Sequence, residues 1–487
     1  MQYNKKKGSS MTFISSTFAI FFAIFTILYF IAAELKKGGL KFQRLLLLIA
    51  SIIFYAFADL RFLPFMFYAV ALSYFGGLSL RIGGRHKRIR LFALVAASLA
   101  PLLFFKYSPA EWRGGIIFPL GLSFFTFQSI SYIVDCYKNK IEAESDFITV
   151  AQFINFFPVI SSGPIQRANN LIPQLKKTHQ FEYDNATNGM KLFAWGILKK
   201  IYVADKIALY VNCVYESPAD QHGLALLLAT ILYSFQIYCD FSGYSDMAIG
   251  AARILGFDVG RNFDHPYLSQ SIGEFWRRWH ISLSSWLKDY VYIPLGGSRV
   301  ALPRIYLNLL ITFLVSGIWH GSTWNFVIWG LLHGLYQCAG RTSKPLFEKI
   351  KLPSFIKIFF TFCLVTFAWI FFRAKDLKEA FAVIQGFGKI PMELARFISP
   401  ENPTGFKDTL KELFALNNSS FGYLSGMMII LATTAGFAII SAATQKKEGL
   451  KIIKTLPFLL RWCIYIVLTV IIWEASTSSV NFIYQNF

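Results

Sequence analysis

The stretch FISSTFAIFFAIFTILYFIAA, from Phe13 to Ala33, contains no charged residue and decides the class of fold. A helix that crosses the hydrocarbon core of a bilayer needs about 20 mostly apolar residues, and this stretch has that length. Its apolar run is longer than the core of a secretory signal, and no A-x-A-like cleavage site follows it. We therefore interpret it as the first membrane span.

Comparable apolar stretches recur along the whole chain. Because backbone groups in lipid must be satisfied within the segment itself, each of them is expected to be a helix. They predict an all-α, polytopic integral membrane protein with roughly ten to twelve transmembrane helices. Besides the first, they include Leu45–Phe57, Leu91–Phe105, Leu224–Tyr238, Leu307–Trp319, Phe355–Phe372, Met427–Ala443 and Phe458–Trp473.

The composition agrees with a chain that lies in lipid. Of the 487 residues, 55% are hydrophobic and 15% charged, whereas soluble proteins have roughly a quarter charged residues. No repeat of fixed period and no low-complexity linker divides the chain, so we expect one membrane-embedded domain over residues 1–487. Residues 1–10 are a possible N-terminal extension before Met11. Residues 374–421 are expected to be extramembrane, with an amphipathic part on the membrane surface.

The formal net charge of +21 raises the question of nucleic acid binding. The basic residues, however, lie in short runs between apolar segments, as the positive-inside rule produces, so no nucleic acid partner is expected. Basic loops follow the first span (Lys36 to Arg44) and the third (Arg81 to Arg90), while only Asp59 and Arg61 follow the second. This alternation predicts an outward N-terminus, and the basic segment Gln445–Lys454 favours an outward C-terminus.

The six cysteines stand singly in or beside apolar segments. Without a C-x-x-C spacing they predict neither a disulfide framework nor a zinc site, and we interpret them as buried thiols. No metal site is expected. The cysteines are Cys136, Cys213, Cys239, Cys338, Cys363 and Cys463.

Polar residues directly follow the apolar run that ends at Tyr238. Asp240, Ser242 and Asp246 stand there in the segment YCDFSGYSD. Ionisable groups at membrane depth are costly and normally face a protein interior or a wet cavity. The favoured interpretation is that the two acids cap a broken helix. Direct contact with a substrate is the alternative.

The segment Glu274–Tyr290 combines aromatic and charged residues. Trp276, Trp279 and His280 recur at helical intervals on one side, while Arg277 and its polar neighbours make the segment too polar to cross lipid unaided. We interpret it as an interfacial or re-entrant helix. An aromatic anchor with snorkelling arginines explains the tryptophans equally well, but does not require His280.

A third polar motif, SGIWHGSTWN from Ser316 to Asn325, lies at the end of an apolar run. Because charge is expensive there, His320 is expected to be neutral and hydrogen-bonded. A neutral imidazole is what a general base requires, although a lone membrane histidine is more often structural. His333 is interpreted as structural.

Taken in order, these motifs resemble the membrane-bound O-acyltransferase family. The resemblance covers most of the chain and several independent motifs. The segment Phe371–Ala374 and the amphipathic stretch after it are similar to the bacterial alginate O-acetyltransferase branch, more than to the D-alanyl transfer protein of teichoic acid synthesis. The motifs are Phe156–Ile165, Asp240–Gly250, Asn262–Phe263, Phe275–Leu283, Tyr292–Gly297 and Gly317–Gly321.

The resemblance implies a fold of transmembrane and re-entrant helices around a central tunnel. It implies that His320 is the essential catalytic histidine and His280 the second one, with His280, Asn262 or Ser316 as candidate donors to the oxyanion. No cofactor is expected to be bound, and no cofactor-binding residue is identified. The candidate residues for substrate contact or the tunnel wall are Asp240, Ser242, Asp246, Asn262, Trp276, Arg277, Trp279, Ser316, Trp319 and Asn325.

The resemblance also implies the substrates and partners. The donor would be a cytoplasmic acyl thioester, acetyl-CoA or an acyl carrier protein, and the acceptor a cell-surface glycan such as an alginate-like polysaccharide or peptidoglycan. The partner would be an extracytoplasmic SGNH hydrolase-like acetyltransferase or a small acceptor protein. The chain would lie as a multi-pass protein in the bacterial cytoplasmic membrane.

Other functions remain open at this point. D-alanyl transfer to teichoic acid-type polymers is one, and a proton-coupled transporter or flippase with intramembrane acids and histidines is another. No inverted repeat supports the transporter. A noncatalytic scaffold of the same fold is a further alternative, against which the presence of His320 speaks. Neither G-x-S-x-G nor a Walker phosphate loop is present to compete.

Overall fold

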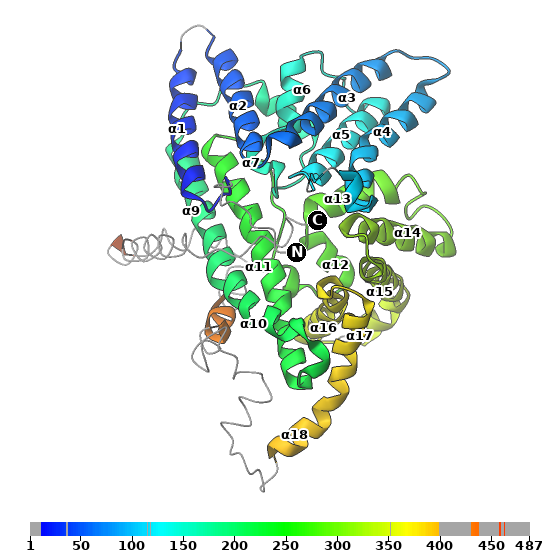
Figure 1. The fold of residues 1–487 in the computed structure, drawn as a ribbon. Coiled ribbons are helices and arrows are strands. Elements are labelled where there is room, and N and C mark those ends of the chain that lie inside the picture. Colours follow the sequence, from blue (N-terminus) through cyan, green and yellow to red (C-terminus); the bar gives the residue numbers. More distant parts are fainter. Residues whose placement is uncertain are drawn as a thin grey trace. The chain divides into compact units, whose positions relative to one another are not determined.

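The computed structural model describes residues 11–35, 38–113, 115–116, 118–350, 352–398, 430–437, 457–458 and 462, without the side chains of residues 110, 346–349, 397 and 398. Every regular element in these ranges is a helix, and no strand occurs in them (Figure 1). The predicted all-α class is therefore confirmed. Most of Phe458–Trp473 and much of Met427–Ala443 lie outside the described residues.

Seven helices in the described part of the chain are long and apolar enough to cross a membrane. They confirm the membrane character that the sequence predicts, while the total of roughly ten to twelve spans stays a prediction. The largest extension is that of the predicted stretch Leu224–Tyr238, which belongs to the helix Gly223–Ile254. The seven are Ser16–Ala33, Gly39–Ala56, Leu60–Arg81, Lys87–Tyr107, Gly223–Ile254, Leu302–His320 and Ser354–Arg373.

The chain divides into two compact units whose sequence ranges interleave, so a single functional domain stays a prediction. Unit 1 comprises residues 1–197, 244–262 and 458–487. Its central helix is α5 (Leu122–Tyr137), which is buried almost all round and packs against α3 and α4. The other helices of unit 1 are α1 (Ser16–Ala33), α2 (Gly39–Ala56), α3 (Leu63–Arg81), α4 (Lys87–Tyr107), α6 (Phe147–Ile154), α7 (Phe157–Ile160), α8 (Ala168–Leu175) and most of α9 (Tyr183–Leu198), with short 3-10 turns at Leu60–Phe62 and Ala110–Arg113.

Unit 2 comprises residues 198–243 and 263–457 and contains all the histidine motifs singled out above. Its core is the antiparallel pair α14 (Leu302–His320) and α15 (Trp324–Lys349), joined by a short turn and flanked by α12 (Ile272–Arg278) and α16 (Ser354–Arg373) (Figure 1). The other elements are the π-helix Lys199–Ala204, α10 (Asp205–Glu216), most of α11 (Gly223–Ile254), α13 (Ile281–Leu287), the π-helix Lys288–Tyr292, α17 (Leu377–Gly386) and α18 (Ile390–Ile398), with 3-10 turns at Pro218–Asp220, Pro266–Leu268 and Phe387–Lys389.

Two of the sequence interpretations are wrong. α11 runs without a break from Gly223 to Ile254, so Asp240 and Asp246 lie inside a helix and do not cap one. The segment Glu274–Tyr290 is not one helix either, because α12 and α13 meet at a sharp break where His280 takes the left-handed conformation, with φ 44° and ψ 55°. The carboxylate of Asp240 forms an ion pair with Lys200 and does not cap a helix. At His280 the backbone turns, and this ends α12.

Glycine makes the pairing of α14 with α15 possible. A Cβ on Gly317 would lie 2.2 Å from the carbonyl oxygen of Phe326, and one on Gly330 would lie 2.4 Å from that of Phe313. No side chain fits at such distances, so backbone packs directly against backbone, as small residues allow between membrane helices. This contact brings the C-terminal end of α14, with His320, against the first turns of α15.

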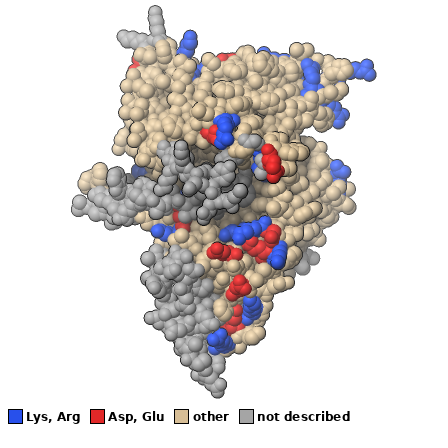
Figure 2. Space-filling model, viewed as in Figure 1, with Lys and Arg blue, Asp and Glu red and all other residues tan. Residues whose placement is uncertain are grey.

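The helix α3 separates the two loops on which the predicted topology depends. Its 19 residues correspond to a length of about 28 Å, enough to place its two ends on opposite sides of a bilayer core. Blue side chains gather at the tip of the α3–α4 hairpin, whereas most of the visible surface is free of charge (Figure 2). The structure is thus compatible with a basic cytoplasmic loop at Arg81–Arg90.

We expect cysteines at positions 60 and 85 to label from opposite sides of the membrane. In a cysteine-free background, Arg85→Cys should react with an impermeant maleimide only after the membrane is opened, and Leu60→Cys, at a site 69% exposed, in intact cells. Both should react in permeabilised cells, which controls for reactivity. Labelling of both positions from the same side would refute the topology.

Substitution of Gly317 by alanine should destabilise unit 2. The added methyl group would have to displace the backbone at Phe326, and overpacking of this kind typically costs about 1–3 kcal/mol. The midpoint of thermal unfolding in detergent is the measurement. Gly340→Ala is the matched control, because Gly340 lies in the same helix pair with no atom within 4 Å of the added Cβ. Equal melting temperatures for the two variants would contradict the close contact.

Candidate active site

His320 is the last residue of α14 and is 2% exposed. Its ring lies among three aromatic rings, with centroid distances of 4.5 Å to Trp319, 4.9 Å to Trp329 and 5.2 Å to Phe372. The Trp329 and Phe372 contacts are edge-to-face, the arrangement that aromatic pairs prefer. These rings come from α14, α15 and α16, so the imidazole is held where the three helices meet.

His280 stands at the break between α12 and α13 and is 1% exposed. Its ring packs edge-to-face on Phe241 of α11 at 4.7 Å. Burial lowers the pKa of His280 to about 3, so the imidazole is neutral at physiological pH. The left-handed backbone is unusual for a residue with a side chain, and such strain is found preferentially at functional sites.

Trp319 connects the two histidines that the sequence singled out. Its ring lies 4.5 Å from that of His320 and 6.4 Å from that of His280. The structure thus brings both histidines to one indole, although they are far apart in the sequence. We interpret this pair of buried imidazoles as the centre of the site.

His333, which the sequence interpretation made structural, belongs to the same aromatic cluster. It lies on α15 and is fully buried, and its Nδ1 accepts a hydrogen bond of 3.2 Å from the indole Nε1 of Trp276. Its ring is 5.0 Å from Trp329, the residue that also contacts His320. His333 therefore contributes a hydrogen bond and ring packing to the core, and it also lies close to the site.

Ser316 and Asn325 flank His320 and are fully buried. Ser316 lies one turn before His320 on α14, hence on the same face of that helix. The amide nitrogen of Asn325 donates to the carbonyl oxygen of Ala374 at 2.8 Å. Among the described residues, neither Ser316 Oγ nor Asn325 Oδ1 has a hydrogen-bond partner.

Asp240 is part of a buried ion cluster. Lys200 Nζ lies 2.7 Å from a carboxylate oxygen of Asp240 and 2.7 Å from one of Asp205, with all three side chains at most 6% exposed. Burial alone would lower the pKa of Lys200, but the two carboxylates outweigh it and raise that pKa. Beside this cluster, Lys199 Nζ donates to Ser242 Oγ at 2.9 Å. These contacts explain Asp240 and Ser242 through pairing within unit 2.

The remaining candidates have different surroundings. Trp279 packs on Trp369 at 5.1 Å and is buried, while Arg277 is exposed. Asp246 and Asn262 belong to unit 1, where Asn262 Nδ2 donates to Ser245 Oγ at 3.2 Å. Their predicted role at the site stays a prediction.

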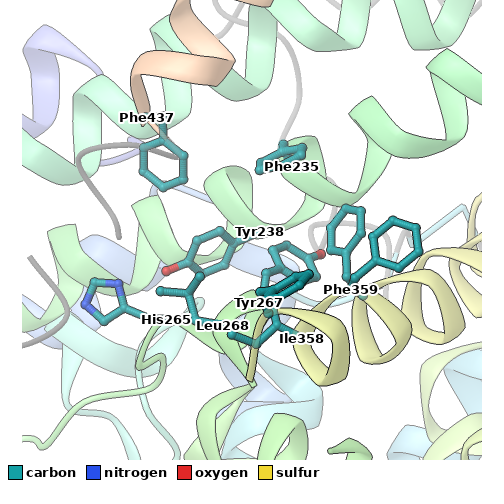
Figure 3. A pocket seen from close by; sticks show the side chains of 10 residues that line it. Phe235, Tyr238, His265, Tyr267, Leu268, Ile358, Phe359 and Phe437 are labelled. Carbon is teal, nitrogen blue, oxygen red and sulfur yellow. The ribbon is translucent and has the colours of Figure 1, made fainter. Parts of the chain in front are cut away.

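An apolar pocket of about 360 Å³ lies elsewhere in unit 2. Tyr238 and Tyr267 stand at its centre, with His265 toward one end and Phe359 toward the other (Figure 3). Tyr238 and Tyr267 each lie 6.0 Å from Trp279, the neighbour of His280. The ring of Trp279 therefore lies near both tyrosines of this pocket and directly precedes His280 in the chain.

Several residues of the site are absent from the sequence prediction. Trp329 and His333 follow Asn325 at intervals of four residues, a helical pattern that could have indicated a shared face. Phe241, Phe372 and Lys200 reach the site or its neighbourhood through contacts between distant segments, for which the sequence holds no local signal. No group of three or more potential metal ligands is found in the part of the chain that the structure describes.

Comparisons with known proteins agree with the geometry. The model of the membrane-bound O-acyltransferase family matches residues 119–375, which include every histidine of the cluster. A peptidoglycan O-acetyltransferase of Helicobacter pylori is 33% identical over 488 positions, covering 86% of this chain and 92% of the relative. A Pseudomonas aeruginosa protein named "Probable alginate O-acetylase AlgI" is 37% identical, covering 77% and 74% of the two chains. A teichoic acid D-alanyltransferase of Bacillus subtilis is 30% identical, covering 58% and 78%.

The family match spans more than half of the chain, and the first relative aligns over nearly its full length. The matched region holds the buried pair His280 and His320 around Trp319. His320 and Trp319 lie on α14, which is apolar and of membrane-spanning length, whereas His280 stands between the short helices α12 and α13. The chain therefore belongs to the membrane-bound O-acyltransferase family, and it is a multi-pass membrane enzyme that transfers acyl groups.

Proposed function

We propose that this enzyme takes an acetyl group from a cytoplasmic thioester and passes it across the bacterial inner membrane for O-acetylation of a cell-surface polysaccharide. Two relatives that align over three quarters or more of this chain carry O-acetyl transfer to peptidoglycan or alginate in their names. The observation that carries the proposal is the pair of buried histidines whose rings both lie near Trp319, at 6.4 Å and 4.5 Å, within unit 2.

In the proposed reaction, His320 is the general base. A nitrogen of its neutral imidazole takes the proton of the acceptor hydroxyl as the hydroxyl oxygen attacks the thioester carbonyl carbon. The tetrahedral intermediate then collapses, the carbon–sulfur bond breaks, and the imidazolium returns its proton to the leaving thiolate. The products are an O-acetyl ester and a free thiol, so that protons and electrons balance without a cofactor.

His280 is proposed to stabilise the oxyanion of that intermediate. A neutral imidazole has one N–H donor, and its burial in aromatic surroundings strengthens the hydrogen bond because the local dielectric constant is low. The strained backbone at His280 is compatible with a side chain whose direction is fixed by the break between α12 and α13. Ser316, one turn from His320, is a second candidate donor.

The donor is proposed to be acetyl-CoA or an acetylated carrier protein, both of which present a thioester on a pantetheine arm. The acceptor is proposed to be an extracytoplasmic SGNH hydrolase-like acetyltransferase or a small acceptor protein, which then modifies the glycan. A route in two stages matches the chemistry, since the thioester and the surface glycan lie on opposite sides of the membrane.

Transfer of D-alanine to a teichoic acid-type polymer is the second candidate, because relatives with that name align over part of the chain. The O-acetyltransferases cover more of the chain at higher identity, and this favours acetyl transfer. Purified protein offered acetyl and D-alanyl thioesters in parallel separates the two. Faster transfer of D-alanine would reverse the preference.

Replacement of His320 by alanine should abolish transfer but leave donor binding intact. Loss of a general base typically lowers the rate about 10²–10⁴-fold. Transfer of a radiolabelled acetyl group and binding of coenzyme A, both with purified protein, are the measurements. His86→Ala is the control, since His86 is exposed at the start of α4. Transfer by His320→Ala within a few-fold of wild type would place the base elsewhere.

Replacement of His280 by asparagine should lower the turnover number by about 10²-fold, as loss of an oxyanion donor does. Asparagine tolerates the left-handed backbone better than other side chains, so it removes the imidazole with little strain. The melting temperature should therefore stay close to that of wild type. His280→Ala is the comparison and should lose both activity and some stability. If His280→Asn keeps the turnover number of the wild type, then His280 has only a structural role.

A further inference from the structure

Four buried polar atoms around the helix pair α14–α15 have no hydrogen-bond partner among the described residues. They are Ser316 Oγ, Asn325 Oδ1, Trp329 Nε1 and His333 Nε2, and each of these residues is at most 1% exposed. Each such group is unfavourable when it is left unsatisfied in the interior. A ligand bound along this helix pair would satisfy all four.

The tautomer of His333 follows from its contact with Trp276. An indole N–H can only donate, so Nδ1 of His333 must be the acceptor of the 3.2 Å hydrogen bond. The proton of the neutral imidazole then resides on Nε2. The atom without a partner is therefore a donor, and its direction is fixed by the Trp276 contact.

Asn325, Trp329 and His333 form a row on one face of α15. Residues four apart lie on the same side of a helix, at a rise of about 6 Å per step. Along this row the atoms without a partner are an acceptor, a donor and a donor. The row starts beside the turn that carries His320, and Trp329 contacts the rings of both His320 and His333, at 4.9 Å and 5.0 Å.

The surroundings of these few polar atoms are aromatic. The rings around His333 include Phe275, Phe313 and Trp369 at 6.2–6.3 Å. A sugar chain carries hydroxyl groups on every ring and would leave most of them unsatisfied in such surroundings. An extended chain of methylene groups with occasional amides fits better, because an amide offers both an acceptor oxygen and a donor N–H.

We propose that His333, with Trp329 and Asn325, binds the amide-bearing pantetheine arm of the acyl donor and so positions the thioester at His320. This rests on the proposed function, because it takes a pantetheine thioester as the donor. His333 acts as a binding residue, whereas His320 and His280 act on the reacting atoms. The Nε2–H of His333 donates to an amide carbonyl of the arm.

Binding of three probes to the full-length protein in detergent tests this assignment. Coenzyme A and free pantetheine contain the arm, and adenosine 3′,5′-bisphosphate lacks it. His333→Phe keeps an aromatic ring but removes the donor, and should weaken binding of both arm-bearing probes roughly tenfold, the loss expected for one buried hydrogen bond. Binding of the bisphosphate should not change.

Matched variants separate this effect from general damage to the core. Thr312→Val is the control, because its buried hydroxyl is already bonded to the carbonyl oxygen of Asn308 at 2.6 Å. His333→Gln restores an N–H donor and should recover most of the affinity. Trp329→Phe removes the neighbouring donor and should also weaken the arm-bearing probes, which keeps the test open should His333→Phe fold poorly.

The outcomes distinguish this inference from the proposed function. Unchanged affinity for coenzyme A and pantetheine in His333→Phe and Trp329→Phe would overturn the inference, and so would an equal loss for the bisphosphate. In both cases transfer by the wild-type enzyme would leave the proposed function standing. If wild-type protein transfers no acyl group from any thioester, the proposed function fails and the inference fails with it.

Discussion

Gly317 and Gly330 let the helices α14 and α15 meet backbone to backbone, and the site depends on that contact. With any larger residue at either position the two helices would have to separate by the width of a side chain. His320 would then lose Trp329, its partner from α15. In a membrane, where no hydrophobic force presses one apolar helix against another, such close packing is what holds catalytic groups in register.

The buried polar groups of unit 2 are of two kinds, those with partners in the protein and those without. Lys200, Asp205 and Asp240 satisfy one another in a closed ion cluster, so their charges are neutralised within the protein. Around α14 and α15, by contrast, buried donors and acceptors such as those of Trp329 and His333 are left without protein partners among the described residues. The first arrangement is complete within the protein, whereas the second leaves donors and acceptors for the ligand proposed above.

The positions of His320 and His280 are fixed in different ways. His320 continues a regular helix and is held by rings from three helices, so its position follows from packing. His280 sits at a break in left-handed backbone, so its direction follows from a local turn. The position of His320 therefore depends on the packing of helices, and that of His280 on the local backbone.

The sequence by itself determined the class of fold and the family, and it singled out His280 and His320, because apolar runs and ordered motifs are local in the chain. The uninterrupted course of α11 and the break at His280 were decided only in the folded protein. Asp240 does not act as a helix cap there, because its carboxylate pairs with Lys200, forty residues away. The place of His333 was likewise settled by Trp276 from another helix. Contacts between distant segments depend on packing in three dimensions, and a local pattern contains no record of them.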